Sequence, residues 1–265
     1  MKRITLGALD YGLAFGVDRT LRDLLLRGRL SAVGCMVGTD LWSREFLPMK
    51  EVAEELGERG LVGLTLTLSG DRAKPVSPRM AQVYGDVLPT RGAWERRAFF
   101  RMLPEEILKA EVSAQIEAYV SKMERPPDFI SLREGLMDRS AIAKLVIKTI
   151  ATAGLSRLPY LVTSLPPGLQ AGRVRSMAKK NGIEVLPWGP PLPETEDREQ
   201  LHTRLRRHFD GLTDMTFVAG VPGAADDRLR RDESREKIAI RECHREVLGS
   251  GRFFRTLDEK DVFLN

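Results

Sequence analysis

The sequence predicts an α/β protein, a seven-stranded (β/α) TIM-like barrel in a single domain. Apolar runs typical of strands alternate with amphipathic stretches typical of helices along the 265 residues. Short connections join most of them, which is the pattern of parallel βα units with right-handed crossovers. No G-x-G-x-x-G sequence follows the first apolar run and no Walker sequence occurs, so a nucleotide-binding fold has no support. We therefore expect one closed or nearly closed barrel over residues 1–265.

Each strand is predicted from a short apolar run that ends at a polar or turn-forming residue. The expected strands cover residues 3–9, 32–37, 62–68, 128–132, 160–163, 183–187 and 216–219. The tail through Phe254 and Val262 is a candidate for one more short strand.

Each helix is predicted from apolar residues that recur with helical spacing between these runs. The expected helices cover residues 17–27, 44–59, 105–123, 140–151, 172–180, 195–209 and 232–248. Pro104 precedes the third of them, a position that favours a helix start.

Residues 69–104 interrupt this alternation. They contain four prolines and an arginine-rich aromatic cluster at residues 94–100. We expect a long excursion with one short helix at most, serving as a lid or as a dimer arm. The apolar and aromatic content of the cluster favours an interface, so we expect a homodimer.

Charge and cysteine content restrict the class of protein. The net charge of +5 is small for this length, and arginine-rich stretches at 204–207 and 228–231 lie among acids. This pattern is more typical of solvated helix faces than of nucleic-acid binding. Cys35 and Cys243 have no partner at metal or redox spacing, which favours a reduced, cytoplasmic setting. No signal sequence or apolar run near the roughly 20 residues of a membrane span is evident, so we expect no membrane association.

In a barrel, the loops at the carboxyl ends of the strands form the functional face. Asp10, at the end of the first strand, and Glu134, after the fourth, are the candidate catalytic residues. The residues that we expect to bind a ligand are Tyr11, Thr65, Thr67, Arg133 and Trp188. Hydroxyl groups beside aromatic walls suit a sugar-like ligand, although an ordinary wet barrel mouth has the same composition.

A catalytic zinc site usually needs three protein ligands, commonly histidines with a carboxylate. The only histidines are His202, His208 and His244, and all lie inside predicted helices. We expect them at the surface or at an interface. An oxygen-only site for Mg²⁺ around Asp10 and Asp40 stays open.

Nucleophilic catalysis has no support, because Cys35 has no evident histidine partner and no G-x-S-x-G sequence occurs. A carboxylate pair could join Asp10 to Glu134, or to Asp226 or Asp227 after the seventh strand. A structural ion pair with Arg133 is the more frequent role for such an acid.

Four stretches resemble the YdjC/ChbG-type carbohydrate deacetylases, which include the HpnK-like proteins. Residues 8–12 read A-L-D-Y-G where that family reads A-D-D-F-G, and residues 63–68 read G-L-T-L-T-L where it reads G-L-H-L-T-L. Residues 130–137, I-S-L-R-E-G-L-M, correspond to a histidine cluster. Residues 220–223, G-V-P-G, correspond to H-P-G, and an acidic loop and an R-E-x-E-like sequence at 235–237 follow.

The resemblance implies a seven-stranded barrel, often dimeric, that uses a divalent metal such as Mg²⁺ or Zn²⁺. The metal polarises the amide carbonyl of an N-acetylated sugar and activates water, and an aspartate acts as base. The base corresponds to Leu9, and the metal-binding aspartate to Asp10. The histidine ligands correspond to Thr65, Arg133, Gly135, Met137 and Val221.

The resemblance therefore implies a divergent member, a pseudoenzyme in which Asp10 is a vestigial ligand and no metal or other cofactor is held. Loss of a general base alone costs about 10²–10⁴ in rate. Arg133 stands where a histidine would, and its guanidinium could replace the charge of the metal beside Asp10.

Two functions follow from these residues. The first is a catalytically silent barrel that binds a sugar-like ligand or a protein partner. The second is an active hydrolase that removes acetyl from an N-acetylated sugar by altered chemistry around Asp10.

Overall fold

The computed structural model describes residues 1–265, and the chain forms two compact units. The first unit contains residues 1–34, 48–62 and 189–265, and the second contains residues 35–47 and 63–188.

Every predicted strand is present, and so is the short strand proposed for the tail. The strands are β1 (Lys2–Tyr11), β2 (Ala32–Cys35), β3 (Leu61–Leu66), β4 (Phe129–Leu132), β5 (Tyr160–Val162), β6 (Val185–Leu186), β7 (Thr216–Ala219) and β8 (Val262–Leu264).

All predicted helices are present as well, together with four that were not predicted as separate helices: α3, α4, α9 and α11. The α-helices are α1 (Phe15–Leu26), α2 (Trp42–Leu56), α3 (Pro78–Tyr84), α4 (Arg91–Phe99), α5 (Glu105–Met123), α6 (Ser140–Ala151), α7 (Leu169–Lys180), α8 (Arg198–Asp210), α9 (Asp227–Asp232), α10 (Arg235–Gly249) and α11 (Gly251–Glu259). Two 3₁₀ segments, η1 (Gly57–Arg59) and η2 (Arg133–Asp138), complete the order. None of the helices has both the length and the apolar character needed to cross a bilayer.

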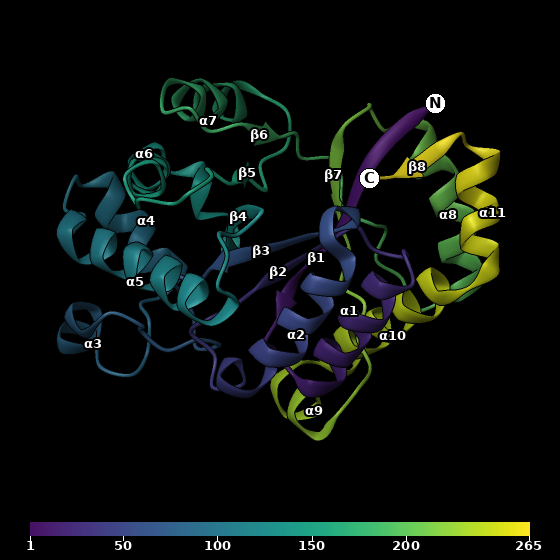
Figure 1. The fold of residues 1–265 in the computed structure, drawn as a ribbon, viewed down its shortest axis with the longest axis horizontal. Helices are drawn as coiled ribbons and strands as arrows, with labels where there is room; N and C mark the ends of the chain where they lie inside the picture. Colours follow the sequence, from purple (N-terminus) through teal and green to yellow (C-terminus); the bar gives the residue numbers. More distant parts are fainter. The chain divides into compact units, whose positions relative to one another are not determined.

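In the first unit, β1 pairs in parallel with two strands from the carboxyl-terminal part of the chain. Its register with β7 runs from Ile4↔Thr216 to Gly7↔Ala219, and β8 pairs with its first residues. Because β1 and β7 are parallel, their carboxyl ends lie at the same edge. In the same unit α8, α10 and α11 contact one another, drawn in green and yellow in Figure 1.

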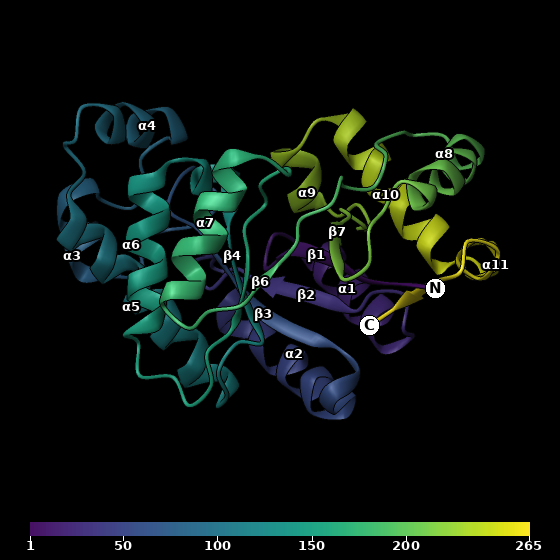
Figure 2. The same ribbon diagram turned by 90° about the horizontal axis from the view of Figure 1, so that it is seen from above.

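In the second unit, β3, β4, β5 and β6 are hydrogen-bonded in sequence order and are all parallel. Helix α5 contacts α6, and α6 contacts α7, so that the three helices form a row that Figure 2 shows clearly. Consecutive neighbours of this kind are expected of βα units with right-handed crossovers.

The start of β3 packs so closely on β4 that its glycine leaves no room for a side chain. A Cβ atom at Gly63 would lie 2.4 Å from the carbonyl oxygen of Phe129 and 2.6 Å from its ring. We expect Gly63→Ala to lower the free energy of unfolding by about 1–3 kcal/mol, because the neighbouring backbone cannot move away cheaply. Urea unfolding measures the change.

Gly92 in α4 provides the matched control, since a Cβ atom there meets nothing within 4 Å. Gly92→Ala should leave the protein as stable or stabilise it by about 0.4–1 kcal/mol. Equal effects of the two substitutions would show that the close approach at Gly63 does not limit the fold.

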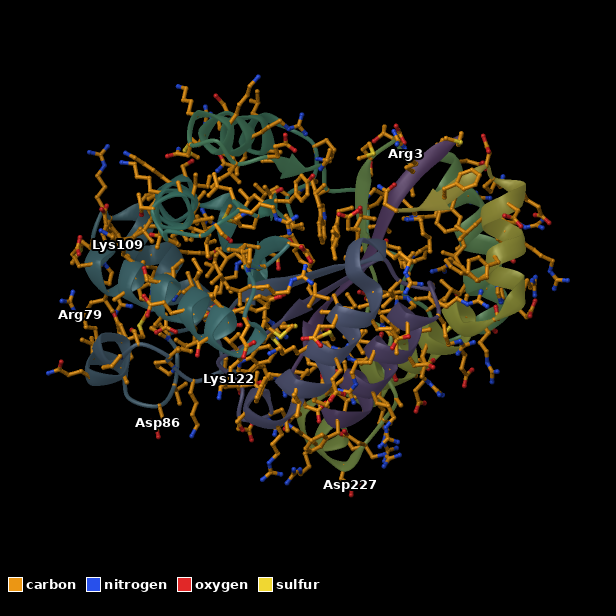
Figure 3. The ribbon with its side chains drawn as sticks, in the orientation of Figure 1. Arg3, Arg79, Asp86, Lys109, Lys122 and Asp227 are labelled. Atoms are coloured by element: carbon orange, nitrogen blue, oxygen red, sulfur yellow. The ribbon has the colours of Figure 1, made fainter.

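Residues 69–104 contain two helices, α3 and α4, rather than the one short helix expected at most. The prolines were expected to prevent helices in this segment. Pro78 does not, because it occupies the first turn of α3, where a missing N–H breaks no hydrogen bond. Buried Trp94 of α4 anchors the segment by donating from Nε1 to the Leu68 carbonyl oxygen (2.6 Å). Arg79 of α3 and Asp86, which follows this helix, point outward (Figure 3). The role of lid or dimer arm stays a prediction.

Candidate functional site

Asp10, the acid predicted at the functional face, lies next to last in β1. Its side chain is 18% exposed, and its Oδ2 accepts a hydrogen bond from Nη2 of Arg241 in α10 at 2.9 Å. These residues are 231 positions apart in the sequence. Helix α10 follows the loop that leaves β7, and the parallel pairing of β1 with β7 brings that loop to the end of β1.

Arg241 is held by a second carboxylate. Its Nε and Nη2 donate to Oε2 and Oε1 of Glu233 at 2.7 and 2.9 Å, a bidentate pair. The side chains of Arg241 and Glu233 are only 6% and 7% exposed. Burial by itself would lower the pKa of Arg241, but the charges of Asp10 and Glu233 outweigh it and raise the pKa above its ordinary value. A permanently charged guanidinium therefore lies directly on the Asp10 carboxylate.

His244 lies one turn further along α10 and is 1% exposed. Its Nδ1 accepts from the Val221 N–H, and its Nε2 faces the Pro193 carbonyl oxygen, both at 3.1 Å. This pair of contacts requires a neutral ring with the proton on Nε2. The expectation of a surface or interface histidine is wrong here, and also for His202, which is buried. The ring fixes Val221, the position that the resemblance matches to a metal-binding histidine.

Burial lowers the pKa of His244. When a histidine is harder to protonate in the folded state, the protein loses stability as the pH falls below the pKa of that histidine in the unfolded chain, about 6.5. Replacing His244 with glutamine should therefore reduce the loss of stability that occurs as the pH falls from about 7 to values below about 6.5. Urea unfolding at a series of pH values measures this loss. The contributions of His202 and His208 remain in both proteins and cancel. Parallel stability curves for the two proteins would contradict this assignment.

Sequence reasoning did not single out Arg241 and placed His244 at the surface or an interface, although the helix that carries them was predicted. The buried residues of α10 are Ile240, Arg241, Cys243, His244, Val247 and Leu248. Two polar side chains on the apolar stripe of a helix need partners inside the protein. The apolar positions of α10 are visible in the sequence, but they do not by themselves distinguish Arg241 from the other charged residues of this helix.

In the second unit, the hydroxyl groups predicted to line an open rim are buried. Thr65 and Thr67 are each 1% exposed. The Thr65 Oγ1 accepts from the Ser131 Oγ at 3.1 Å, and the Thr67 Oγ1 has no hydrogen-bond partner. These side chains lie inside the unit at the ends of β3 and β4, below any surface that a ligand could reach directly.

Arg133 and Glu134 lie at the start of η2, after β4. The Nη1 of Arg133 donates to the Sδ of Met36 at 2.8 Å. Glu134 is exposed, has a left-handed φ of 60°, and accepts from the Ser69 hydroxyl, which ties η2 to the start of the 69–104 segment. Asp10 belongs to the first unit, so its pairing with either residue stays a prediction.

The two predicted aromatic walls differ. Trp188 is partly exposed. Tyr11 is fully buried, and its hydroxyl accepts from Arg22 Nη1 at 2.6 Å. Burial and the bond to Arg22 of α1 do not favour ligand contact at Tyr11, and its role at a ligand site stays a prediction.

The acids after β7 have local roles. Asp226 caps α9 by accepting from the Leu229 N–H at 2.7 Å and also accepts from the Gly16 N–H at 2.8 Å. Asp227 points outward (Figure 3), is fully exposed, and accepts from Nη1 of Arg230 in the same helix at 3.4 Å. Neither is directed at Asp10 by these contacts, so a carboxylate pair with them has no support.

The divalent cation implied by the resemblance does not fit these donors. The one retained ligand, Asp10, is engaged by Arg241, and the histidine positions hold Thr65, which bonds to Ser131, and Val221. No group of three or more histidine, cysteine or acidic side chains lies close enough together to hold a metal ion. The arrangement can instead bind polar groups through hydrogen bonds and fixed charges.

Residues 3–259 match the family described as YdjC-like protein. The chain belongs to the YdjC-like family. A comparison with curated protein sequences finds no match.

Among solved structures, a proposed cellobiose-phosphate cleavage protein of Enterococcus faecalis V583 superposes with a TM-score of 0.77 at 16% identity, covering 100% of this chain and 97% of the other. A family 4 carbohydrate esterase of Streptomyces lividans covers 100% of this chain and 92% of its own at 10% identity, with a TM-score of 0.44; at that score we argue nothing from it. The first likeness confirms the predicted fold class of this YdjC-like chain, the seven-stranded (β/α) barrel.

Proposed function

We propose that this YdjC-like protein is a carbohydrate deacetylase-like protein that has lost metal-dependent deacetylation and binds a sugar-like ligand. One observation carries the first part: the buried guanidinium of Arg241 lies 2.9 Å from Asp10 Oδ2. An arginine cannot be deprotonated in a protein and offers no vacant coordination position. It supplies positive charge, but neither a Lewis acid nor an activated water.

The chain's residues support binding more than bond cleavage. Arg241 donates to both Glu233 and Asp10, so the Asp10 Oδ2 atom is occupied by a charged donor while this pair persists. The fold of the YdjC-like chain is shared with a protein described as acting on cellobiose phosphate, which favours a hydroxylated ligand. Arg133 and Trp188, both partly exposed, are the side chains that we expect to contact it.

The decisive measurement combines metal content with deacetylation. We expect the purified protein to carry no stoichiometric zinc, to show no calorimetric titration with Zn²⁺, Mg²⁺ or Mn²⁺ at micromolar concentrations, and to release no acetate from N-acetylated sugars. Metal bound at one equivalent together with acetate release would overturn the proposal. Acetate release without metal would instead favour an altered hydrolase that uses Asp10.

Ligand binding needs its own test. A panel of neutral, N-acetylated and phosphorylated sugars should include at least one that raises the thermal midpoint, and Arg133→Ala should weaken that shift by about 10-fold in concentration. Exposed Arg231 of α9 offers a matched control in Arg231→Ala. Equal shifts in both variants would remove Arg133 from the ligand site.

A further inference from the structure

The end of α4 presents an apolar tip that nothing in the chain covers. We define this tip as Phe99, Phe100 and Met102, whose exposed fractions are 80%, 64% and 71%. The rings of Phe99 and Phe100 contact each other edge to face, with their centroids 5.1 Å apart. Large apolar side chains that are exposed together, within four residues, mark an interaction site more often than isolated ones do.

The local geometry gives no folding reason for this tip. The Met102 N–H donates to the Arg97 carbonyl oxygen at 2.8 Å, and the Arg101 N–H donates to Ala98 at 3.3 Å, which is a Schellman helix end. The residue at the Met102 position of such a motif usually packs back on the helix, but here it is exposed. Arg101 has a φ of 56°, a conformation that favours glycine. Packing within the second unit therefore explains neither the left-handed arginine nor the exposed methionine.

The tip stands on a firm base. Trp94 is fully buried and bonds to Leu68. The Arg97 guanidinium lies over the rings of Tyr84 and Trp94, at 5.3 and 5.2 Å from their centroids. Figure 2 shows α4 at the margin of the second unit. The tip therefore projects from a helix whose other face is fixed.

The charge around the tip is positive. From Arg91 to Met102 there are four arginines and one acid, a formal charge of +3. The acid, Glu95, is already paired with Arg91 at 2.9 Å. Arg96 and Arg101 are exposed and have no ion-pair partner. Two exposed acids, Glu105 and Glu106, follow the tip at the start of α5, so the stretch from Arg91 to Glu106 carries a formal charge of +1. The unpaired arginines nearest the rings still favour a partner surface that carries anionic groups beside apolar ones.

We propose that this tip docks on the surface of a bilayer that contains anionic lipids. Phe99, Phe100 and Met102 enter the interfacial region, and Arg96 and Arg101 lie at the level of the lipid phosphates. A second copy of the chain is the competing occupant, because the exposed acids Glu105 and Glu106 could pair with these arginines across a two-fold contact, and the test below separates the two. The proposal differs from the expectation of no membrane association, and it does not depend on the chemistry proposed above.

The test uses the full chain and sedimentation with vesicles of phosphatidylcholine alone or mixed in equal parts with phosphatidylglycerol. We expect binding to the mixed vesicles, loss of binding at high salt, and little binding to phosphatidylcholine alone. Phe99→Ala combined with Phe100→Ala should weaken binding by at least about 10-fold through lost apolar burial. Exposed Leu169 of α7 (87%) is the matched control, and Leu169→Ala should bind as the natural protein does.

A second variant separates binding from folding. Arg101→Gly removes one charge and relieves the left-handed strain, so the thermal midpoint should stay or rise while binding falls about 5-fold. Phe100→Trp should show quenching of its fluorescence by brominated lipid, which reports insertion of the tip itself.

Three results would overturn the proposal. The first is absence of binding to mixed vesicles. The second is equal binding by the Phe99/Phe100 double variant and by Leu169→Ala. The third is a homodimer in solution, by light scattering, that dissociates when both phenylalanines are replaced, since the tip would then be a contact between copies.

Discussion

Replacing Arg241 with alanine is expected to lower the free energy of unfolding by about 3–5 kcal/mol, because it removes the buried cation that two carboxylates contact. Asp10 and Glu233 lie within 3 Å of the guanidinium, and Arg241 and Glu233 are more than nine-tenths buried. Removal of one partner from a buried pair costs more than the pair itself contributes. Arg241→Lys should cost about 1–3 kcal/mol, since an ammonium group cannot reproduce the bidentate contact with Glu233. Urea unfolding followed by circular dichroism measures both.

A neighbouring helix offers the control. Arg230 of α9 pairs at 3.4 Å with Asp227, whose side chain is fully exposed, so Arg230→Ala should cost at most about 1 kcal/mol. In the triple variant Arg241→Met, Asp10→Asn, Glu233→Gln, much of the lost stability should return, because no buried charge is left unpaired. A loss at Arg241 no larger than that at Arg230 would show that the cluster is screened by water.

Glu111 carries the second large expected effect. Its carboxylate is fully buried in α5 and accepts from the Val76 N–H (2.9 Å), the Ser77 N–H (2.8 Å) and the Gln115 side-chain amide (2.8 Å). Gln115 in turn bonds to both backbone groups of Thr67, at the end of β3. Glu111→Ala strips several buried donors of their acceptor and opens a cavity, so we expect a loss of about 3–5 kcal/mol.

Local as well as global stability should respond, because this network joins α5 to the start of the 69–104 segment. Hydrogen exchange at residues 69–77 should accelerate more than exchange in β4. Glu117→Ala, on the exposed side of the same helix, is the matched control and should change stability by less than about 0.5 kcal/mol. Uniform acceleration across the second unit would mean that Glu111 supports the whole unit rather than this connection.

The fold was predictable because periodicity is a local property. Helix α5, for example, buries Leu108, Val112 and Ile116 at the spacing visible in the sequence. The segment 69–104 was not predictable in the same way, because its helices are short and are stabilised by contacts with distant groups, as Trp94 is by Leu68. Short helices depend on tertiary packing more than on propensity.

The candidate site was predicted only in part. Asp10 was found because it ends an apolar run, but Tyr11, Thr65 and Thr67 are buried where a ligand-facing surface was expected. Exposure at the end of a strand depends on which loops cover it, and those loops come from elsewhere in the chain. Arg241 escaped notice because a charged residue in a charged helix is usually solvated.

By itself, the sequence determined the alternation of strands and helices, the barrel class and the absence of histidines from the strand ends. Each of these depends on residues that are close together in the sequence. Only the tertiary structure decided which cation lies on Asp10, what His244 fixes and that an aromatic tip is left uncovered. Those outcomes depend on contacts between residues as much as 231 positions apart, and such contacts form only when the parallel pairing of β1 with β7 brings the two ends of the chain together.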